Sequence, residues 1–181
     1  MADKDYGLPS FVNYGSLQNQ PINTNLTAPT NYVFLLPKVP NSVYFCTSVT
    51  IPGMNCTSIS IKSGRGLPLK TPSSEVSHGD LTFTYLINED MSNYDELMGW
   101  FRTMTAFRDF TNLANTKNWM SEEGQLLVLS AKKNPVARFT FRGLFPSNLS
   151  GVTFNSADTE ANALIATCTL QFTYYNIESL L

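Results

Sequence analysis

The segment from Leu164 to Tyr175 alternates between apolar and polar side chains over its whole length, and this pattern constrains the fold most. A period of two is typical of a β-strand with one face on a core and the other in a wet environment. The segment is longer than the usual strand of about five or six residues. We therefore expect one long strand here, preceded by a turn at Phe145–Asn148 and by a second alternating segment. Its polar face is uncharged and consists of Thr167, Thr169, Gln171 and Thr173.

Charge is scarce throughout the chain. Of its 181 residues only 14% are charged, and the formal net charge is −2. Globular domains usually carry about 25% charged residues, and surface charge keeps monomers dispersed in solution. We expect much of the surface to be covered in subunit contacts, with a merely neutral, polar surface as the alternative. Electrostatic capture of nucleic acid is not indicated, since it depends on many Lys and Arg side chains.

Several other classes of protein are not indicated by the sequence. No apolar run approaches the roughly 20 residues that span a bilayer, and the first residues lack the layout of a signal peptide. We therefore expect assembly in a reducing cytoplasm. Three cysteines without Cys-x-x-Cys spacing predict neither a disulfide framework nor a zinc site. No cofactor is expected.

Residues 43–62 are predicted to form a β-hairpin around the turn Ile51–Asn55, because alternating segments flank a Pro-Gly pair. One face of this hairpin is apolar. The opposite face carries Ser, Thr and Cys side chains. If subunits close into a ring through their unpaired strand edges, this polar face is predicted to line the lumen of the ring. Residues 63–80 are rich in Gly, Pro and Ser and are predicted to be a long functional loop. The predicted lumen-facing residues are Cys46, Ser48, Thr50, Ser58 and Ser60.

The remaining pattern predicts a mainly β protein of the α+β class. Strands are expected at 32–36, 81–87, 126–129 and 137–141. One helix is expected after Ser92, which can cap it. Its residues Leu97, Trp100 and Phe101 are predicted to pack on the β core. The result is an antiparallel β-barrel or sandwich with one covering helix.

An extended N-terminal arm over residues 1–28 is predicted to precede a β-barrel domain over residues 29–181. Residues 6–37 contain no charge, and aromatic side chains are spaced among turn formers. The arm is expected to dock on a neighbouring subunit, with a leader that has no function as the alternative. Together with the two positive charges of the 63–80 loop, the predicted inter-subunit residues are Tyr6, Phe11, Tyr14, Arg65 and Lys70.

Catalytic chemistry is not indicated. The single histidine, His78, lies in a Ser-His-Gly-Asp stretch typical of an exposed turn. No Ser or Cys occupies a Gly-x-Ser-x-Gly nucleophile elbow. Paired carboxylates from distant segments, as glycosidases use, stay an open alternative, but the sequence favours a protein that is not an enzyme.

Three segments together resemble the tail tube proteins of contractile-tailed bacteriophages, over roughly residues 30–177. The first joins Tyr32-Val-Phe-Leu-Leu-Pro37 to the Ile51-Pro-Gly53 turn. The second runs from Phe83 through Trp100. The third begins at Phe139, contains Gly-Leu-Phe-Pro-Ser, and ends in the long strand to Tyr175.

The resemblance implies a structural virion protein whose hexameric rings stack into the inner tube of a contractile tail. Strands of six subunits would close into an inner β-barrel through which the genome passes, without specific binding of DNA or of a tape-measure protein. The implied partners are the sheath, baseplate and tail terminator proteins, and the same fold recurs in type VI secretion tubes. Two alternatives stay open: a specialised ring next to the baseplate or terminator, and a monomeric β-sandwich that binds a ligand.

Overall fold

The computed structural model describes residues 24–62, 64, 66–105, 120–155 and 163–180. Antiparallel strands dominate it, which confirms the mainly β prediction. In chain order the elements are β1 (Tyr32–Leu35), α1 (Pro40–Tyr44), β2 (Cys46–Thr50), β3 (Met54–Ile61), β4 (Leu69–His78), β5 (Leu81–Leu86), α2 (Ser92–Thr105), β6 (Ser121–Leu129), β7 (Pro135–Leu149), β8 (Ile165–Gln171) and β9 (Tyr174–Ser179). No helix of the described residues is long and apolar enough to span a membrane.

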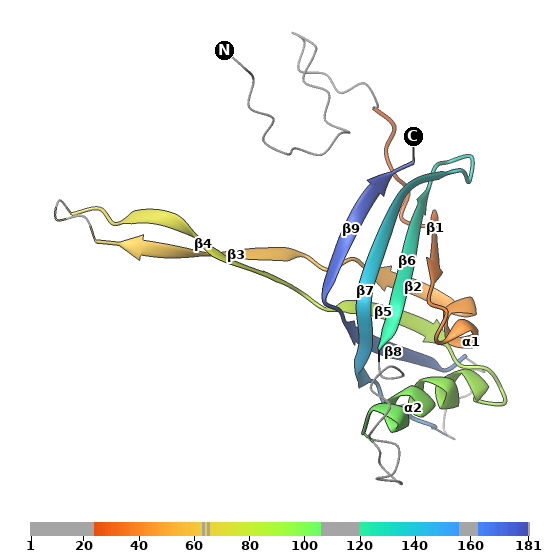
Figure 1. Ribbon diagram of the computed structural model, residues 1–181. Coiled ribbons are helices and arrows are strands. Elements are labelled where there is room, and N and C mark those ends of the chain that lie inside the picture. The colour runs from red at the N-terminus through yellow and green to blue at the C-terminus, as the bar shows by residue number, and fades with distance from the viewer. Residues whose placement is uncertain (1–23, 63, 65, 106–119, 156–162, 181) are drawn as a thin grey trace.

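The main sheet has two halves that cross each other (Figure 1). Strand order is β1-β6-β7-β8-β5-β2, and β9 pairs with β7. Strand β7 belongs to both halves, because residues 137–142 pair with β6 and β9 while residues 145–149 pair with β8. The order leaves β1 and β2 as the two ends of this path, and β9 is a further edge strand because it pairs with β7 alone.

The hydrophobic core lies between the two halves. Alternate residues of β5, namely Leu81, Phe83 and Tyr85, are fully buried. The Phe83 ring lies 5.5 Å from that of Phe34 in β1, centroid to centroid, so the rings connect the two halves. Full burial of such side chains stabilises the fold by about 1.5–3 kcal/mol each.

Helix α2 covers one end of this core. It begins one residue earlier than the predicted cap implies, because the amide of Asp95 donates to the carbonyl of Met91 and Ser92 is already helical. The Asp90 carboxylate accepts the Ser92 amide, which lowers the pKa of Asp90.

The apolar side of α2 faces the core, as predicted. Leu97 and Trp100 are buried, whereas Phe101 is only half-buried. The helical spacing therefore identified the packed face correctly and placed Phe101 at its margin.

The predicted hairpin over residues 43–62 is wrong. Residues 40–44 form helix α1, which Pro40 favours at its first position. Ser42 holds α1 on α2, because its hydroxyl donates to the carbonyl of Asn93 and its amide donates to Glu96. Strand β2 pairs with β5, and β3 pairs with β4, so the two predicted arms belong to different sheets.

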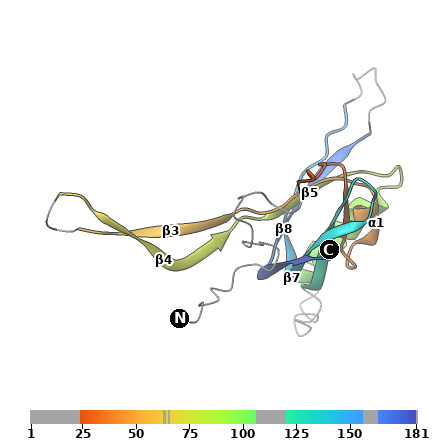
Figure 2. The ribbon, with the colours of Figure 1, turned by 90° about the horizontal axis from the view of Figure 1, so that it is seen from above.

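The prediction of a loop over residues 63–80 is also wrong. Ten of its residues form β4, which pairs with β3 in a two-stranded ribbon. We call residues 54–61 and 69–78 the β3–β4 ribbon. It projects from the main sheet on the side opposite to α1 in both views (Figures 1 and 2).

The long strand and the turn before it also differ from the prediction. Strand β7 continues through Pro146 with a bulge instead of a turn. The chain bends at Thr173, and Phe172 and Thr173 separate β8 from β9. Opposite this bend stands Gly143, with a φ of 66°, and the Thr173 amide donates to the Arg142 carbonyl. Inward side chains of β7 are Phe141 before Gly143 and Leu144 after it, so this glycine changes the alternation and keeps both parts of β7 on the core.

Candidate functional site

The outer side of β2, β5 and β8 carries uncharged polar side chains. They form two rows of three, because Ser48 aligns with Thr84 and Thr167, and Thr50 aligns with Thr82 and Thr169. None of these three strands contains a charged residue. We call this surface the hydroxyl face, and its members are Ser48, Thr50, Thr82, Thr84, Thr167 and Thr169.

Neighbouring strands are linked across this face by side-chain hydrogen bonds. The hydroxyls of Thr84 and Thr167 lie 3.3 Å apart, and the hydroxyl of Thr47 donates to the carbonyl of Thr84 over 3.1 Å. Ser147 in β7 donates to the carbonyl of Thr169 over 3.2 Å. The side chains of this face thus hydrogen-bond to neighbouring strands, and none of them carries a charge.

The other half of the sheet presents a different outer surface. Arg142 in β7 and Glu123 in β6 approach to 2.9 Å, and Arg138 in β7 and Glu178 in β9 also approach to 2.9 Å. We call these four residues the ion-paired face. Thr140 lies between the two arginines along β7 and aligns with uncharged Gln125 and Asn176.

The structure brings together only two of the predicted lumen residues. Ser48 and Thr50 lie on the hydroxyl face and are exposed. Cys46 does not share it, because a bulge between Cys46 and Ser48 aligns Cys46 with buried Tyr85. The Cys46 side chain is half-buried against the core, and burial raises the pKa of its thiol. The predicted common face of Cys46, Ser48 and Thr50 is therefore wrong at Cys46.

Ser58 and Ser60 lie elsewhere, on the β3–β4 ribbon. Their predicted separation from Ile59 and Ile61 follows the alternation of β3, but all four residues are exposed. The hairpin that was to place them beside Ser48 does not exist, so the proposal of a lumen role is restricted below to residues of the main sheet.

The predicted inter-subunit residues fall mostly outside the described part of the chain. Tyr6, Phe11, Tyr14 and Arg65 are not described, so their role and the boundary of the N-terminal arm stay predictions. Lys70 is an exposed residue of β4 and aligns with Ser60.

Sequence reasoning missed Thr82 and Thr84 as members of the site. Both alternate with buried Leu81, Phe83 and Tyr85, in the same pattern that identified Thr167 and Thr169. The signal was therefore present, but only the pairing of β5 with β8 shows that the four threonines are neighbours.

Groups with possible chemistry are dispersed over the described residues. The ring of His78 stacks on Phe172 with centroids 4.3 Å apart, and its Nε2 lies 3.3 Å from the carbonyl oxygen of Thr173. Among the described residues no three His, Cys, Asp or Glu side chains gather as a metal site requires. The three thiols are free, and burial raises the pKa of Cys168 to about 12.

Comparison with known proteins identifies the family. The sequence matches the phage tail tube protein family over residues 40–178, which is most of the chain. The chain belongs to the phage tail tube protein family. Membership places it among the structural components of tails, and the match includes α1, α2, the β3–β4 ribbon and the main sheet except for β1 and the last residue of β9.

Solved structures show the same fold at low sequence identity. A chain in the cap of the anti-feeding prophage, its tube-terminating cap, is 14% identical, with 91% of this chain and 99% of that chain covered and a TM-score of 0.61. A chain in the baseplate of that particle is 14% identical, with 88% and 99% covered and a TM-score of 0.60. A chain in the extended sheath–tube complex of the extracellular contractile injection system PVC is 12% identical, with 86% and 93% covered and a TM-score of 0.61. Comparison with curated protein sequences gives no match.

Proposed function

We propose that this tail tube protein forms hexameric rings that stack into the inner tube of a contractile bacteriophage tail, and that the tube conducts the genome during ejection. The hydroxyl face is the observation that supports this proposal most directly. DNA carries a phosphate charge about every 1.7 Å of duplex. A wall of Lys or Arg would hold such a polymer, whereas a neutral wall lets it slide.

The hydroxyl face is the proposed wall of the channel. Burial of a hydroxyl without a hydrogen-bond partner costs free energy. In the single subunit Ser48 and Thr50 are exposed, and the four threonines of β5 and β8 are half-buried. A water-filled lumen satisfies them in the tube. Ser48 and Thr50 keep the lumen role that the sequence predicted, and the threonines of β5 and β8 extend it.

Open sheet ends support ring formation. Among the described strands, β1 pairs with β6 alone and β2 with β5 alone, so each has an edge that is free for another chain. Unpaired edges promote association, and closure removes them. Six copies joined through the edge of β2, in the half that carries the hydroxyl face, would form one continuous inner barrel.

The remaining partners follow from the place of a tube in a tail. We propose that the sheath surrounds it, that baseplate and terminator proteins close its ends, and that tape-measure protein and DNA occupy the lumen without specific binding. The subunits would assemble in the host cytoplasm. The N-terminal arm, through Tyr6, Phe11 and Tyr14, would dock on a neighbouring copy, and Arg65 and Lys70 would lie at subunit contacts.

Purified protein tests the assembly directly. Size-exclusion chromatography and negative-stain imaging should show six-fold rings and, at high concentration, long tubes. Similarity to baseplate and cap chains makes a terminal ring the second candidate, and single rings that never elongate would favour it. A stable 20 kDa monomer at all concentrations would contradict both and favour a binding module.

A matched pair of charge substitutions tests the wall. Ser48→Lys places a cation on the hydroxyl face, and Thr140→Lys places the same charge on the ion-paired face. Both variants should form rings. Virions with Ser48→Lys should eject DNA several-fold more slowly at 50 mM salt than at 200 mM, because phosphate contacts are salt-sensitive. Unchanged ejection by Ser48→Lys, or equal slowing by Thr140→Lys, would refute the assignment of the wall.

A further inference from the structure

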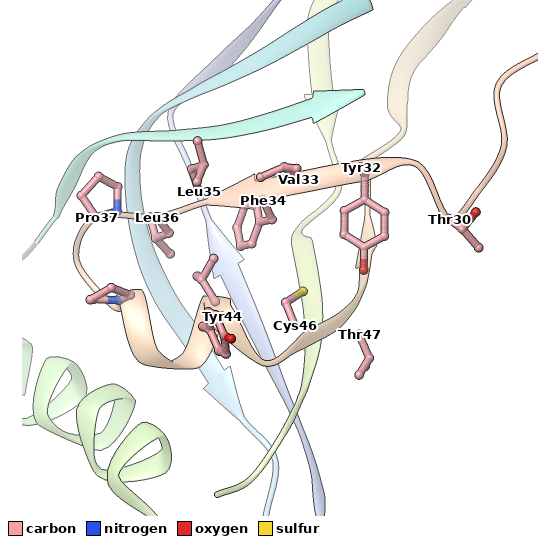
Figure 3. A pocket seen from close by; sticks show the side chains of 12 residues that line it. Thr30, Tyr32, Val33, Phe34, Leu35, Leu36, Pro37, Tyr44, Cys46 and Thr47 are labelled. Atoms are coloured by element: carbon pink, nitrogen blue, oxygen red, sulfur yellow. The ribbon is translucent and has the colours of Figure 1, made fainter. Parts of the chain in front are cut away.

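A groove separates the two open ends of the main sheet (Figure 3). It has a volume of about 800 Å³ and lies between β1 on one side and α1 with β2 on the other. Tyr32 and Phe34 point into it from β1, and Cys46 points into it from β2.

The lining of this groove is apolar and uncharged. Within the described part of the chain, no Asp, Glu, Lys, Arg or His contributes to it. Tyr44 stands at its rim with 84% of its surface exposed, beside half-buried Val43. The free edge of β1 adds unpaired backbone groups, which favour an extended segment as the occupant, since it could pair with this edge and bury apolar side chains.

The β3–β4 ribbon has the complementary surface. Its register places Ile59 beside Thr71 and Ile61 beside Leu69 on one side, and Ser58, Ser60 and Lys70 on the other. The apolar side chains Ile59, Ile61 and Leu69 are 51–60% exposed. A two-stranded ribbon without a core is marginally stable in water, so this apolar side requires a partner surface.

The ribbon cannot fill the groove of its own chain. It leaves the main sheet on the side opposite to α1 in both views (Figures 1 and 2). The root of the ribbon is held by Gly79, whose amide donates to the Gly53 carbonyl, and by His78 on Phe172. At about 3.3 Å per residue, the eight residues of β3 reach roughly 25 Å outward, far enough to contact another subunit.

We propose that the groove between β1 and β2 receives the apolar side of the β3–β4 ribbon of a second copy of this chain. The inference rests on the proposed self-assembly and names its contact surface. Donor and acceptor lie on opposite sides of one molecule, so the contact is head-to-tail. Such contacts close into rings or continue as filaments. Ile59, Ile61 and Leu69 would face Tyr44 and Val43 across the interface.

Disulfide cross-linking to the native Cys46 tests the contact. In a Cys56→Ser background, Leu69→Cys places a thiol on the apolar side of the ribbon, and Lys70→Cys places one on the other side as the matched control. Oxidation of assembled protein should join Leu69→Cys subunits into covalent oligomers on non-reducing gels. Lys70→Cys should give at least five-fold less. Cys168 is buried and should not take part.

The outcomes separate this inference from the proposed function. Rings that form normally but show no Leu69→Cys cross-link, or an equal one from Lys70→Cys, would overturn the inference and leave the tube intact. Absence of rings in the wild-type protein would overturn the proposed function itself.

The N-terminal residues are the rival occupant, and labelling of Cys46 tests them. In the Cys56→Ser background, a small thiol reagent should modify Cys46 at least ten-fold more slowly in assembled protein than in the monomer. Protection that survives deletion of residues 2–23 supports the ribbon. Protection lost on that deletion, in rings that still form, would assign the groove to the N-terminal segment.

A surface substitution gives an independent measure. Tyr44→Asp should leave the melting temperature of the monomer unchanged, because the side chain is exposed, and should reduce assembly at least ten-fold. Phe154→Asp changes another exposed aromatic outside the groove, 70% exposed, and serves as the control. Normal assembly of Tyr44→Asp would contradict the proposal.

Discussion

The hydroxyl face and the ion-paired face are outer surfaces of one sheet, yet they present different chemistry to solvent. The first contains Ser and Thr on three strands without a charge, and the second contains two Arg–carboxylate pairs on three other strand segments. Low overall charge is therefore not spread evenly over the surface. Charged side chains lie on the outer surface of the half formed by β6, β9 and the first part of β7. Strands β2, β5 and β8 of the other half contain none.

Strand β7 shows how one chain supplies both surfaces. Its first part contributes Arg138 and Arg142 to the ion-paired face, and its second part pairs with β8 beside the hydroxyl face. Between them Gly143 changes the direction and the alternation of the strand. The difference between the faces thus depends on one backbone position.

Gly143→Ala should have the largest effect on this division. A positive φ strains any side chain, at about 1–3 kcal/mol. An added Cβ would also lie 2.5 Å from the hydroxyl oxygen of Thr173, and such overpacking costs about 1–3 kcal/mol. We expect the free energy of unfolding to fall by about 2–4 kcal/mol, measured by urea denaturation.

Two further variants sharpen that result. Adding Thr173→Ala to Gly143→Ala should recover the steric part and leave the conformational strain. Gly151→Ala is the control, since nothing lies within 4 Å of its added Cβ, and it should change stability by less than about 0.5 kcal/mol. A Gly143→Ala protein as stable as wild type would contradict the expected strain from the positive φ and from the contact with Thr173.

The ion pair of Arg142 with Glu123 should contribute less. Both side chains are partly exposed, at 45% and 32%, and exposed pairs contribute about 0.2–1 kcal/mol. A double-mutant cycle with Arg142→Gln and Glu123→Gln should give a coupling energy in that range, and 1 M salt should reduce it. Coupling above about 2 kcal/mol, unaffected by salt, would show that this face is covered and is not the exposed surface described here.

The spacing of apolar side chains along short stretches of the sequence predicted the strands and the helix that are encoded in consecutive residues. Alternation in 81–87 identified β5, apolar residues identified β1, and helical spacing identified α2 with Leu97 and Trp100 on its buried side. In each case the period of the side chains corresponds to the period of the backbone.

Pairing between distant segments could not be predicted in the same way. The 43–62 hairpin was wrong because alternation and a Pro-Gly pair do not show whether two strands pair with each other or with others. The bulge at Cys46 moved one member of the predicted polar face toward the core, since a shift of one residue exchanges the faces. The groove was not predicted, because it exists only where the two ends of the sheet meet across space.

The smallest expected effect concerns the hydroxyl face itself. Thr84→Val and Thr167→Val each remove one partner of a 3.3 Å hydroxyl contact, and both residues are half-buried, so water can reach the remaining group. Val favours strands at least as well as Thr. Each single variant should change the free energy of unfolding by less than about 1 kcal/mol, and the coupling energy should be below about 0.5 kcal/mol. A coupling above about 1.5 kcal/mol would mean that this pair stabilises the subunit. Small coupling with slower DNA ejection would instead support the proposed role of these threonines in the wall of the channel.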